Sequence, residues 1–262
     1  MFPSTQEFLI NVPLYSKYNL KSYSPDYIFG LEYFSGTIDA YCLGCGQRSV
    51  FKRARAWPHR VPQQDYREKY LDDRQFLVEM ECTRDEHHTM RFYFEVLDSE
   101  VFKVGQYPTL ADLQEHEIVK YRKYLGRQYP EFTRAVGLFA HGIGIGSYVY
   151  LRRIIESLVQ KAHVRAQKDT DWVEDNYQSS RFHERIAMLK DYLPEVMVEN
   201  AGIYSILSKG IHELTEAECL EHFTTLKSGI ELILDEEIAR QARERKVREI
   251  TQGIRRIKGE IS

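Results

Sequence analysis

Paired cysteines constrain the fold of this 262-residue chain more than any other feature of its sequence. Cys42 and Cys45 have the C-x2-C spacing of a zinc knuckle, and the neighbouring Gly44 and Gly46 let backbone amides turn toward thiolate sulfurs. Apolar and polar residues alternate just before the pair, which indicates a strand that enters a turn. The residues after the pair are expected to form the returning strand, so the turn would hold half of a metal site.

The second half of the site is expected beside another strand. Cys82 is followed by His87 and His88, and then by residues 89–96, which alternate strongly between apolar and polar side chains. His88 is in phase with the apolar face of this strand, which favours it as a ligand without excluding His87. The competing interpretation is two unrelated cysteines in a turn and one buried cysteine elsewhere. The predicted ligands of a closed, four-coordinate and therefore structural Zn²⁺ site are Cys42, Cys45, Cys82 and His88.

The composition indicates a soluble globular protein, with 43% hydrophobic and 29% charged residues. A net charge of -3 predicts neither nucleic-acid binding nor its absence. No apolar run reaches the roughly 18–20 residues that span a bilayer, so no membrane association is expected. The N-terminus lacks the basic and apolar regions of a secretory signal, which makes a cytoplasmic location the expectation. Four cysteines in a cytoplasmic chain argue against disulfides and for metal ligation.

The pattern of the chain changes near residue 105, which predicts an α+β protein of two domains. Residues 1–105 are expected to form a small β-rich domain that contains the zinc ribbon, with prolines breaking any helix in residues 1–30. Residues 106–262 are expected to form a larger all-α bundle, because no convincing period-2 segment follows. Pro108 stops a strand, and Thr109 with Asp112 forms a capping box that begins the first helix.

Several helices follow in the second domain. The first is predicted over residues 110–125, and the next begins after Pro130 and continues to about residue 166, with a kink or break open near Gly142. Thr215 and Glu218 make another capping box before the last helical pattern, whose apolar stripe runs to Ile238. Beyond this stripe the sequence contains eight basic residues and three acidic ones. This basic C-terminal helix is expected to bind nucleic acid or an acidic protein partner, unless it is only a solvated helix end.

Two groups of residues are candidates for chemistry or binding. A short basic segment with an interleaved tryptophan could grip phosphates and stack a base, although exposed hairpin loops have the same composition. Its candidate nucleic-acid contacts are Lys52, Arg53, Arg55 and Arg60.

His212 lies at a junction between helices with Lys209 beside it, where a histidine could exchange protons during phosphodiester cleavage and a cation could stabilise the charged transition state. Arg152, Arg153 and Glu156, on the apolar helix that ends near residue 166, could face this point. The alternative is that His212 caps a helix or satisfies a buried carbonyl, and that the arginines and Glu156 form an ordinary helix-face pair.

The chain resembles a family of bacterial proteins with an N-terminal zinc ribbon and a C-terminal helical domain that is similar to the HEPN superfamily (higher eukaryotes and prokaryotes nucleotide-binding). The resemblance rests on Tyr-Leu-Arg-Arg-Ile-Ile-Glu at residues 150–156 and on Ser-Lys-Gly-Ile-His-Glu-Leu at residues 208–214, and it covers roughly residues 110–235. It implies a HEPN-like bundle that binds nucleic acid or a nucleotide, a homodimer, and a role in antiviral defence against foreign DNA.

Many HEPN proteins are metal-independent ribonucleases that use an arginine and a histidine separated by four to six residues. This sequence departs from that pattern, because positions 205–207 before His212 carry no basic residue. Arg134 and His141 match the spacing, but so loose a motif is met by chance in an arginine-rich chain. The sequence therefore predicts a zinc-containing adaptor or effector that binds nucleic acid or a nucleotide. The alternatives are a ribonuclease that uses His212 with Lys209 or Arg152 as the cation, and a module for dimerisation and protein interaction.

Overall fold

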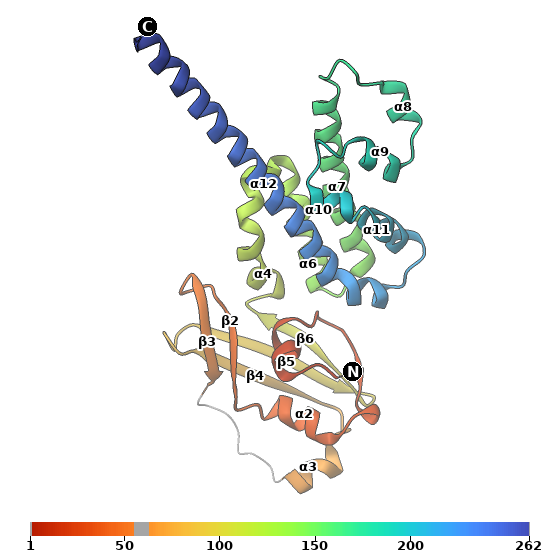
Figure 1. Ribbon diagram of the computed structural model, residues 1–262. Coiled ribbons are helices and arrows are strands. Elements are labelled where there is room, and N and C mark those ends of the chain that lie inside the picture. The colour runs from red at the N-terminus through yellow and green to blue at the C-terminus, as the bar shows by residue number, and fades with distance from the viewer. Residues whose placement is uncertain (1, 55–62, 262) are drawn as a thin grey trace. The chain divides into compact units, whose positions relative to one another are not determined.

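The computed structural model describes residues 2–54 and 63–261, and it confirms a mixed α+β fold (Figure 1). The chain forms two compact units. The first contains residues 1–120 and 136–143, and the second contains residues 121–135 and 144–262.

A curled, fully antiparallel six-stranded sheet forms the centre of the first unit, in the order β1-β6-β5-β4-β3-β2. The predicted strand over residues 89–96 is confirmed as β5. The strands are β1 (Tyr18–Asn19), β2 (Thr37–Cys42), β3 (Gln47–Arg53), β4 (Arg74–Cys82), β5 (Thr89–Leu97) and β6 (Glu100–Tyr107).

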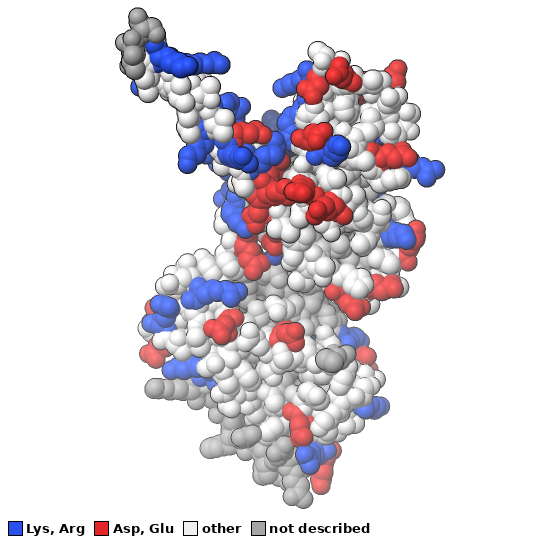
Figure 2. Space-filling view, viewed as in Figure 1, with Lys and Arg blue, Asp and Glu red and all other residues white. Residues whose placement is uncertain are grey.

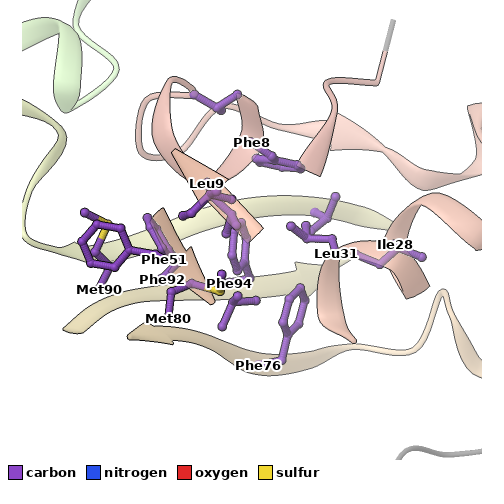
Figure 3. Packing of buried hydrophobic residues seen from close by; sticks show 14 of the residues in the cluster. Phe8, Leu9, Ile28, Leu31, Phe51, Phe76, Met80, Met90, Phe92 and Phe94 are labelled. Atoms are coloured by element: carbon purple, nitrogen blue, oxygen red, sulfur yellow. The ribbon is translucent and has the colours of Figure 1, made fainter. Parts of the chain in front are cut away.

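The core of the first unit lies on one face of this sheet. Alternate residues of β5 are buried, as the period of a strand requires, and Phe92 and Phe94 are fully enclosed. Phe8 of α1 (Thr5–Ile10) packs edge-on against Phe94 with ring centroids 5.4 Å apart, and Phe76 of β4 stacks on the same ring at 5.0 Å. Ile28 of α2 (Pro25–Glu32) covers the neighbouring part of this face (Figure 3). Each such side chain contributes about 1.5–3 kcal/mol by burial.

The expectation that prolines break any helix in residues 1–30 is wrong. Ser4 and Glu7 form a reciprocal capping box that begins α1. Pro25 is in the first turn of α2, where its missing N–H costs no hydrogen bond, and Ser24 caps that helix. Short helices η1 (Leu20–Ser22) and α3 (Gln63–Lys69) complete this part of the chain.

The first unit extends beyond residue 105, the predicted domain boundary, which lies within β6. The capping box of Thr109 and Asp112 is confirmed, and it begins α4 (Leu110–Ile118). His116 of α4 stacks on Tyr41 of β2 with ring centroids 3.9 Å apart and planes 6° from parallel. This packing explains why the first helix after the sheet belongs to the same unit.

The second unit is helical and is organised around α7. Leu151, Ile154, Ile155 and Leu158 of this helix are buried, and it packs against α11 and α12. Between α4 and the end of the chain, the helices are η2 (Val119–Tyr121), α5 (Arg122–Leu125), η3 (Gly126–Gln128), α6 (Tyr129–Ala140), α7 (Gly144–Ala166), α8 (Glu174–Ser179), α9 (Phe182–Met188), α10 (Glu195–Glu199), α11 (Gly202–His212) and α12 (Glu216–Ile261).

The helical pattern predicted from residue 130 to 166 is broken into α6 and α7. Gly142 has φ +75°, a left-handed value that glycine adopts without strain. The carboxylate of Glu216 accepts hydrogen bonds from the amides of Gly144 and Ile145 at 2.5 and 3.0 Å, and so satisfies two of the free donors at the start of α7.

The last helix, α12, is much longer than its apolar stripe to Ile238 predicts. The capping box of Thr215 and Glu218 at its start is confirmed. The helix then continues without interruption for 46 residues to Ile261. Across residues 2–54 and 63–261, no helix is both long enough and apolar enough to cross a bilayer.

Candidate metal centre and helical cleft

The turn between β2 and β3 carries the first half of the candidate metal centre. Cys42 ends β2, and its carbonyl accepts a hydrogen bond from the amide of Gly46 at 2.8 Å. Gly46 has φ +65°, so this tight turn requires a residue that tolerates the left-handed region. The amide of Cys45 donates to Cys42 Sγ at 3.4 Å. The predicted turn of amides toward sulfur is present in this half-site.

The loop between β4 and β5 carries the second half. Cys82 ends β4, and its amide donates to the carbonyl of His88 at 2.9 Å, which closes the loop. The amide of Arg84 donates to Cys82 Sγ at 3.4 Å. Phe51 of β3 is opposite Cys82 in the sheet, so the antiparallel register of β3 and β4 brings the two half-sites to the same end of the sheet.

Four donor atoms meet at this point. Cys45 Sγ is 3.9 Å from Cys82 Sγ, and His88 Nδ1 is 3.6 Å from Cys42 Sγ and 3.3 Å from Cys45 Sγ. All four ligand atoms lie within 4.8 Å of one another. The three cysteines are free thiols, and Cys42 and Cys82 are buried. The four residues predicted as ligands therefore form a cluster that could hold a metal ion.

His88, and not His87, belongs to the cluster. The two ring nitrogens of His88 face different groups, with Nδ1 toward the sulfurs and Nε2 3.6 Å from Asp85 Oδ2. A carboxylate on the far side of a ligating imidazole fixes its orientation and raises its basicity. His87 is exposed, and its amide donates to Asp85 Oδ1 at 3.0 Å.

Gly44 makes room for the ligand ring. A Cβ atom at this position would lie 2.4 Å from both Cδ2 and Nε2 of His88, closer than side chains approach one another. The sequence alone attributes this glycine to the geometry of the turn. The contact shows that the role of Gly44 is steric. This role becomes visible only in the fold, where the loop that carries His88 lies against the turn that carries Gly44.

The electrostatics of the cluster differ between its buried thiols. Burial raises the pKa of the Cys42 thiol to about 11, because the thiolate loses its hydration. Burial acts in the same direction on Cys82, but hydrogen bonds to its sulfur from the backbone amides of Arg84 and Asp85 and from the side chains of Ser49 and Cys45 together outweigh burial. The pKa of Cys82 is therefore below the ordinary value. A bound cation would favour the thiolate at both positions, since metal ligation requires deprotonated sulfur.

In the helical unit, His212 and Lys209 line a cleft of about 250 Å³ between α9 and α11. Phe182, His183, Tyr204 and Ser208 are also part of its lining. His212 is exposed, which removes the interpretation of a histidine buried against a carbonyl. The structure therefore places two of the predicted catalytic residues in one solvent-facing cleft.

Arg152 and Glu156 join α7 to the wall of this cleft. Arg152 Nε donates to Glu156 Oε1 at 2.9 Å, and an Nη donates to the hydroxyl of Tyr204 at 2.8 Å. The Tyr204 hydroxyl in turn donates to Glu156 Oε1 at 3.0 Å, and its ring stacks on Phe182. Arg153 is apart from this network and pairs with Glu131 at 3.2 Å.

The basic segment in the first unit is only partly described. Lys52 forms an ion pair with Glu81 at 3.3 Å. Arg53 donates to the carbonyls of Glu32 and Phe34 at 3.0–3.3 Å, and burial lowers its pKa. Arg55 and Arg60 lie outside the described residues. Nucleic-acid contact by this segment stays a prediction.

No family model matches the chain, and comparisons with curated proteins and with solved structures return no significant match.

Proposed function

We propose that this protein is an adaptor or effector with two working parts, a first unit held together by a structural Zn²⁺ ion and a HEPN-like helical unit that binds nucleic acid or a nucleotide. The observation that carries the proposal is the meeting of three cysteine sulfurs and one histidine nitrogen within 4.8 Å. A role in bacterial defence against foreign DNA rests on the family resemblance alone.

Zinc is the metal that fits this donor set. A tetrahedral ion with Zn–S bonds of about 2.3 Å and Zn–N bonds of about 2.0 Å separates two sulfurs by about 3.8 Å, and a sulfur from a nitrogen by about 3.5 Å. The sulfur–sulfur distance of 3.9 Å and the sulfur–nitrogen distances of 3.6 and 3.3 Å are close to these values. Soft thiolates with one imidazole favour zinc over magnesium or calcium, whose ligands are oxygens.

The site is structural in this proposal because protein ligands supply all four positions. A catalytic zinc keeps one position open for water or substrate. Here the ligands come from two hairpins that join neighbouring strands of one sheet, so the ion would cross-link the β2–β3 turn to the β4–β5 loop. In this role the binding free energy of the ion adds to the stability of the first unit.

Metal analysis of the purified protein tests the zinc site. We expect about one zinc per chain, and less than about half an equivalent would contradict the proposal. Cys82→Ser should lose the metal, and His88→Ala should weaken its retention. Two matched controls should keep it, Cys219→Ala, which removes a cysteine of the helical unit, and His87→Ala, which removes the neighbouring histidine. Iron in place of zinc would refute the metal assignment.

Nucleic-acid or nucleotide binding is proposed for the cleft lined by Lys209 and His212. The two segments that carry the HEPN resemblance meet beside it, because Arg152 of α7 donates to Tyr204 and Ser208 of α11. Lys209 supplies a positive charge for a phosphate, and the two histidines of the lining add donors. The volume is slightly below the ~300 Å³ of small-molecule sites, which suits one phosphate or one base better than a whole dinucleotide.

Binding of a fluorescent single-stranded RNA and of ATP tests this assignment. Lys209→Ala should weaken binding about tenfold, and the affinity should fall as salt rises, because phosphate contacts release counterions. Lys190→Ala, which removes an exposed lysine of the same unit outside the cleft lining, is the matched control. Equal affinity of both variants, or binding that salt does not affect, would contradict the assignment.

A second candidate function is a metal-independent ribonuclease. The observation that favours it is the placing of His212 and Lys209 in one exposed cleft, where an imidazole could exchange protons and an ammonium could stabilise a phosphorane. The carboxylate of Glu156 compensates the charge of Arg152, which leaves Lys209 as the better candidate cation. RNA cleavage in EDTA that His212→Ala abolishes would support this function. Cleavage that survives the change would exclude His212 as its catalyst.

A further inference from the structure

The C-terminal half of α12 extends away from the other helices of its unit (Figure 1). Its packed part ends with Ile233, Leu234 and Glu237, which are buried. From residue 241 to residue 259 every residue is exposed except Gly253, which is half-buried. Figure 2 shows that lysines and arginines cover much of this segment. A solvated helix end would account for the basic residues of this segment. It would not account for the apolar residues that lie among these lysines and arginines.

Four β-branched residues form a regular stripe on this segment. Val247, Ile250, Ile254 and Ile257 are 51–56% exposed and follow one another at intervals of three, four and three residues. This is the a/d spacing of a heptad repeat, which places all four side chains on one seam of the helix. In the single chain this apolar stripe is exposed to water. Its exposure and its regular spacing indicate that it packs against a partner helix.

We infer that the stripe pairs with the same stripe of a second copy of this chain, with the two helices antiparallel. In this register Val247 of each copy packs on Ile257 of the other, and Ile250 packs on Ile254. The two-fold axis passes beside residue 252, and every apolar residue of the stripe is then covered by another. The inference stands independently of the metal site and of the cleft.

The charges beside the stripe select the antiparallel direction. Glu244 and Lys258 both occupy e positions when Val247 is an a position. Antiparallel pairing brings e positions together, so Glu244 of each copy faces Lys258 of the other, and two opposite-charge pairs form. Parallel pairing would place Lys258 next to Gly253 and Glu244 next to Ala239, which offers no ion pair.

The segment contains two glycines, Gly253 and Gly259, and Gly253 falls at the two-fold axis. In the antiparallel register Gly253 of one copy faces Gly253 of the other, and nothing lies within 4 Å of the Cβ position of this glycine in the single chain. Glycine in the interior of an exposed helix costs stability, so its presence here fits a point where two backbones approach closely.

A seam of four residues suffices because the helix already exists. An isolated peptide of this length would have to nucleate its helix, which is unfavourable. Here residues 216–238 are held against the rest of the unit, and the exposed segment continues them. Association therefore has to order side chains only, and not the backbone.

Sedimentation velocity of the full chain tests the inference. We expect a species of twice the 30.9 kDa chain mass at micromolar concentrations. Ile250→Glu should convert it to a monomer, and Gln252→Glu, which adds the same charge on the opposite side of the helix, should leave it intact. A wild-type monomer at all concentrations, or an assembly of three or four copies, would overturn the inference.

Charge reversal tests the direction of pairing. Glu244→Lys and Lys258→Glu should each weaken the dimer about tenfold, because each change turns two attractive pairs into two repulsive ones. The double variant should restore wild-type affinity, since the pairs re-form with their signs exchanged. Circular dichroism checks that each variant keeps its helix content. Single reversals without effect, or a double variant as weak as the singles combined, would refute the antiparallel arrangement.

Discussion

The lysine buried in the first unit should make its stability rise with pH. Lys103 of β6 is fully enclosed, and its Nζ donates to the carbonyl of Leu9 at 2.8 Å and to Gln106 Oε1 at 2.5 Å. Among the described residues no carboxylate pairs with it. Burial without a counter-charge lowers the pKa of this ammonium from 10.5 to about 7.

The size of the change in stability with pH follows from the difference between the folded and unfolded pKa values of Lys103. Between the folded pKa near 7 and the unfolded value of 10.5, the unfolded chain binds the proton that the folded protein has released. Stability therefore increases as pH rises through this window, by about 2 kcal/mol between about pH 7 and pH 9. At pH 7 the lysine costs roughly 4 kcal/mol relative to a side chain that is neutral in both states.

Lys103→Met removes this pH dependence. At pH 7 the loss of the protonation penalty is offset in part, because the Leu9 carbonyl loses its donor at a cost of about 1–3 kcal/mol. The variant should still be more stable than wild type at pH 7, and it should lose that advantage by about pH 9.

Urea denaturation of the zinc-saturated protein, followed by near-ultraviolet circular dichroism, measures the free energy of unfolding of wild type and of Lys103→Met at pH 7 and at about pH 9. Lys21→Met, at an exposed lysine of the same unit, is the matched control and should behave as wild type. Parallel pH profiles for wild type and Lys103→Met would refute the reasoning.

Three further predictions concern the metal centre and the helical unit. Gly44→Ala should lower zinc retention in metal analysis, because its Cβ would displace the His88 ring, whereas Gly30→Ala, at a glycine with open space around its Cβ position, should keep the metal. Glu237→Ala should lower the free energy of unfolding of the helical unit in urea by about 3–5 kcal/mol, because Arg165 and Arg240 lose the buried carboxylate that they share; a loss below about 1 kcal/mol would contradict this. Hydrogen bonds from Gln178, Trp172 and His163 hold the pKa of Glu174 at about 2, so their contribution is complete above the ordinary value of 4.5 and is lost as pH falls through 2. Glu174→Gln should accordingly loosen α8 at neutral pH, and hydrogen exchange of its amides that matches wild type would exclude this role.

Local patterns in the sequence predicted the parts of the structure that depend on near neighbours. The alternation over residues 89–96 predicted β5, and the two capping boxes at Thr109 and Thr215 predicted the starts of α4 and α12. These features involve residues three or four positions apart, or the faces of one strand, so they need no knowledge of the rest of the chain. The same holds for the C-x2-C turn.

Only the fold could decide which helix face each of two adjacent residues occupies and which partner it meets there. Arg152 and Arg153 are adjacent in sequence, but successive residues of a helix point about 100° apart. One therefore joins Tyr204 and Glu156, and the other pairs with Glu131. The sequence could not assign them to separate faces without the positions of the neighbouring helices.

The metal centre combines both kinds of information. The sequence by itself determined which residue types could ligate a metal and that each half-site lies beside a strand, because cysteine spacing and alternation are local. Only the tertiary structure decided that Cys45 and Cys82, 37 residues apart, come within 3.9 Å, and that His88 is the fourth donor. The register of β3 against β4 brings the two halves together, and the missing side chain of Gly44 leaves space for the ring. Both depend on long-range packing.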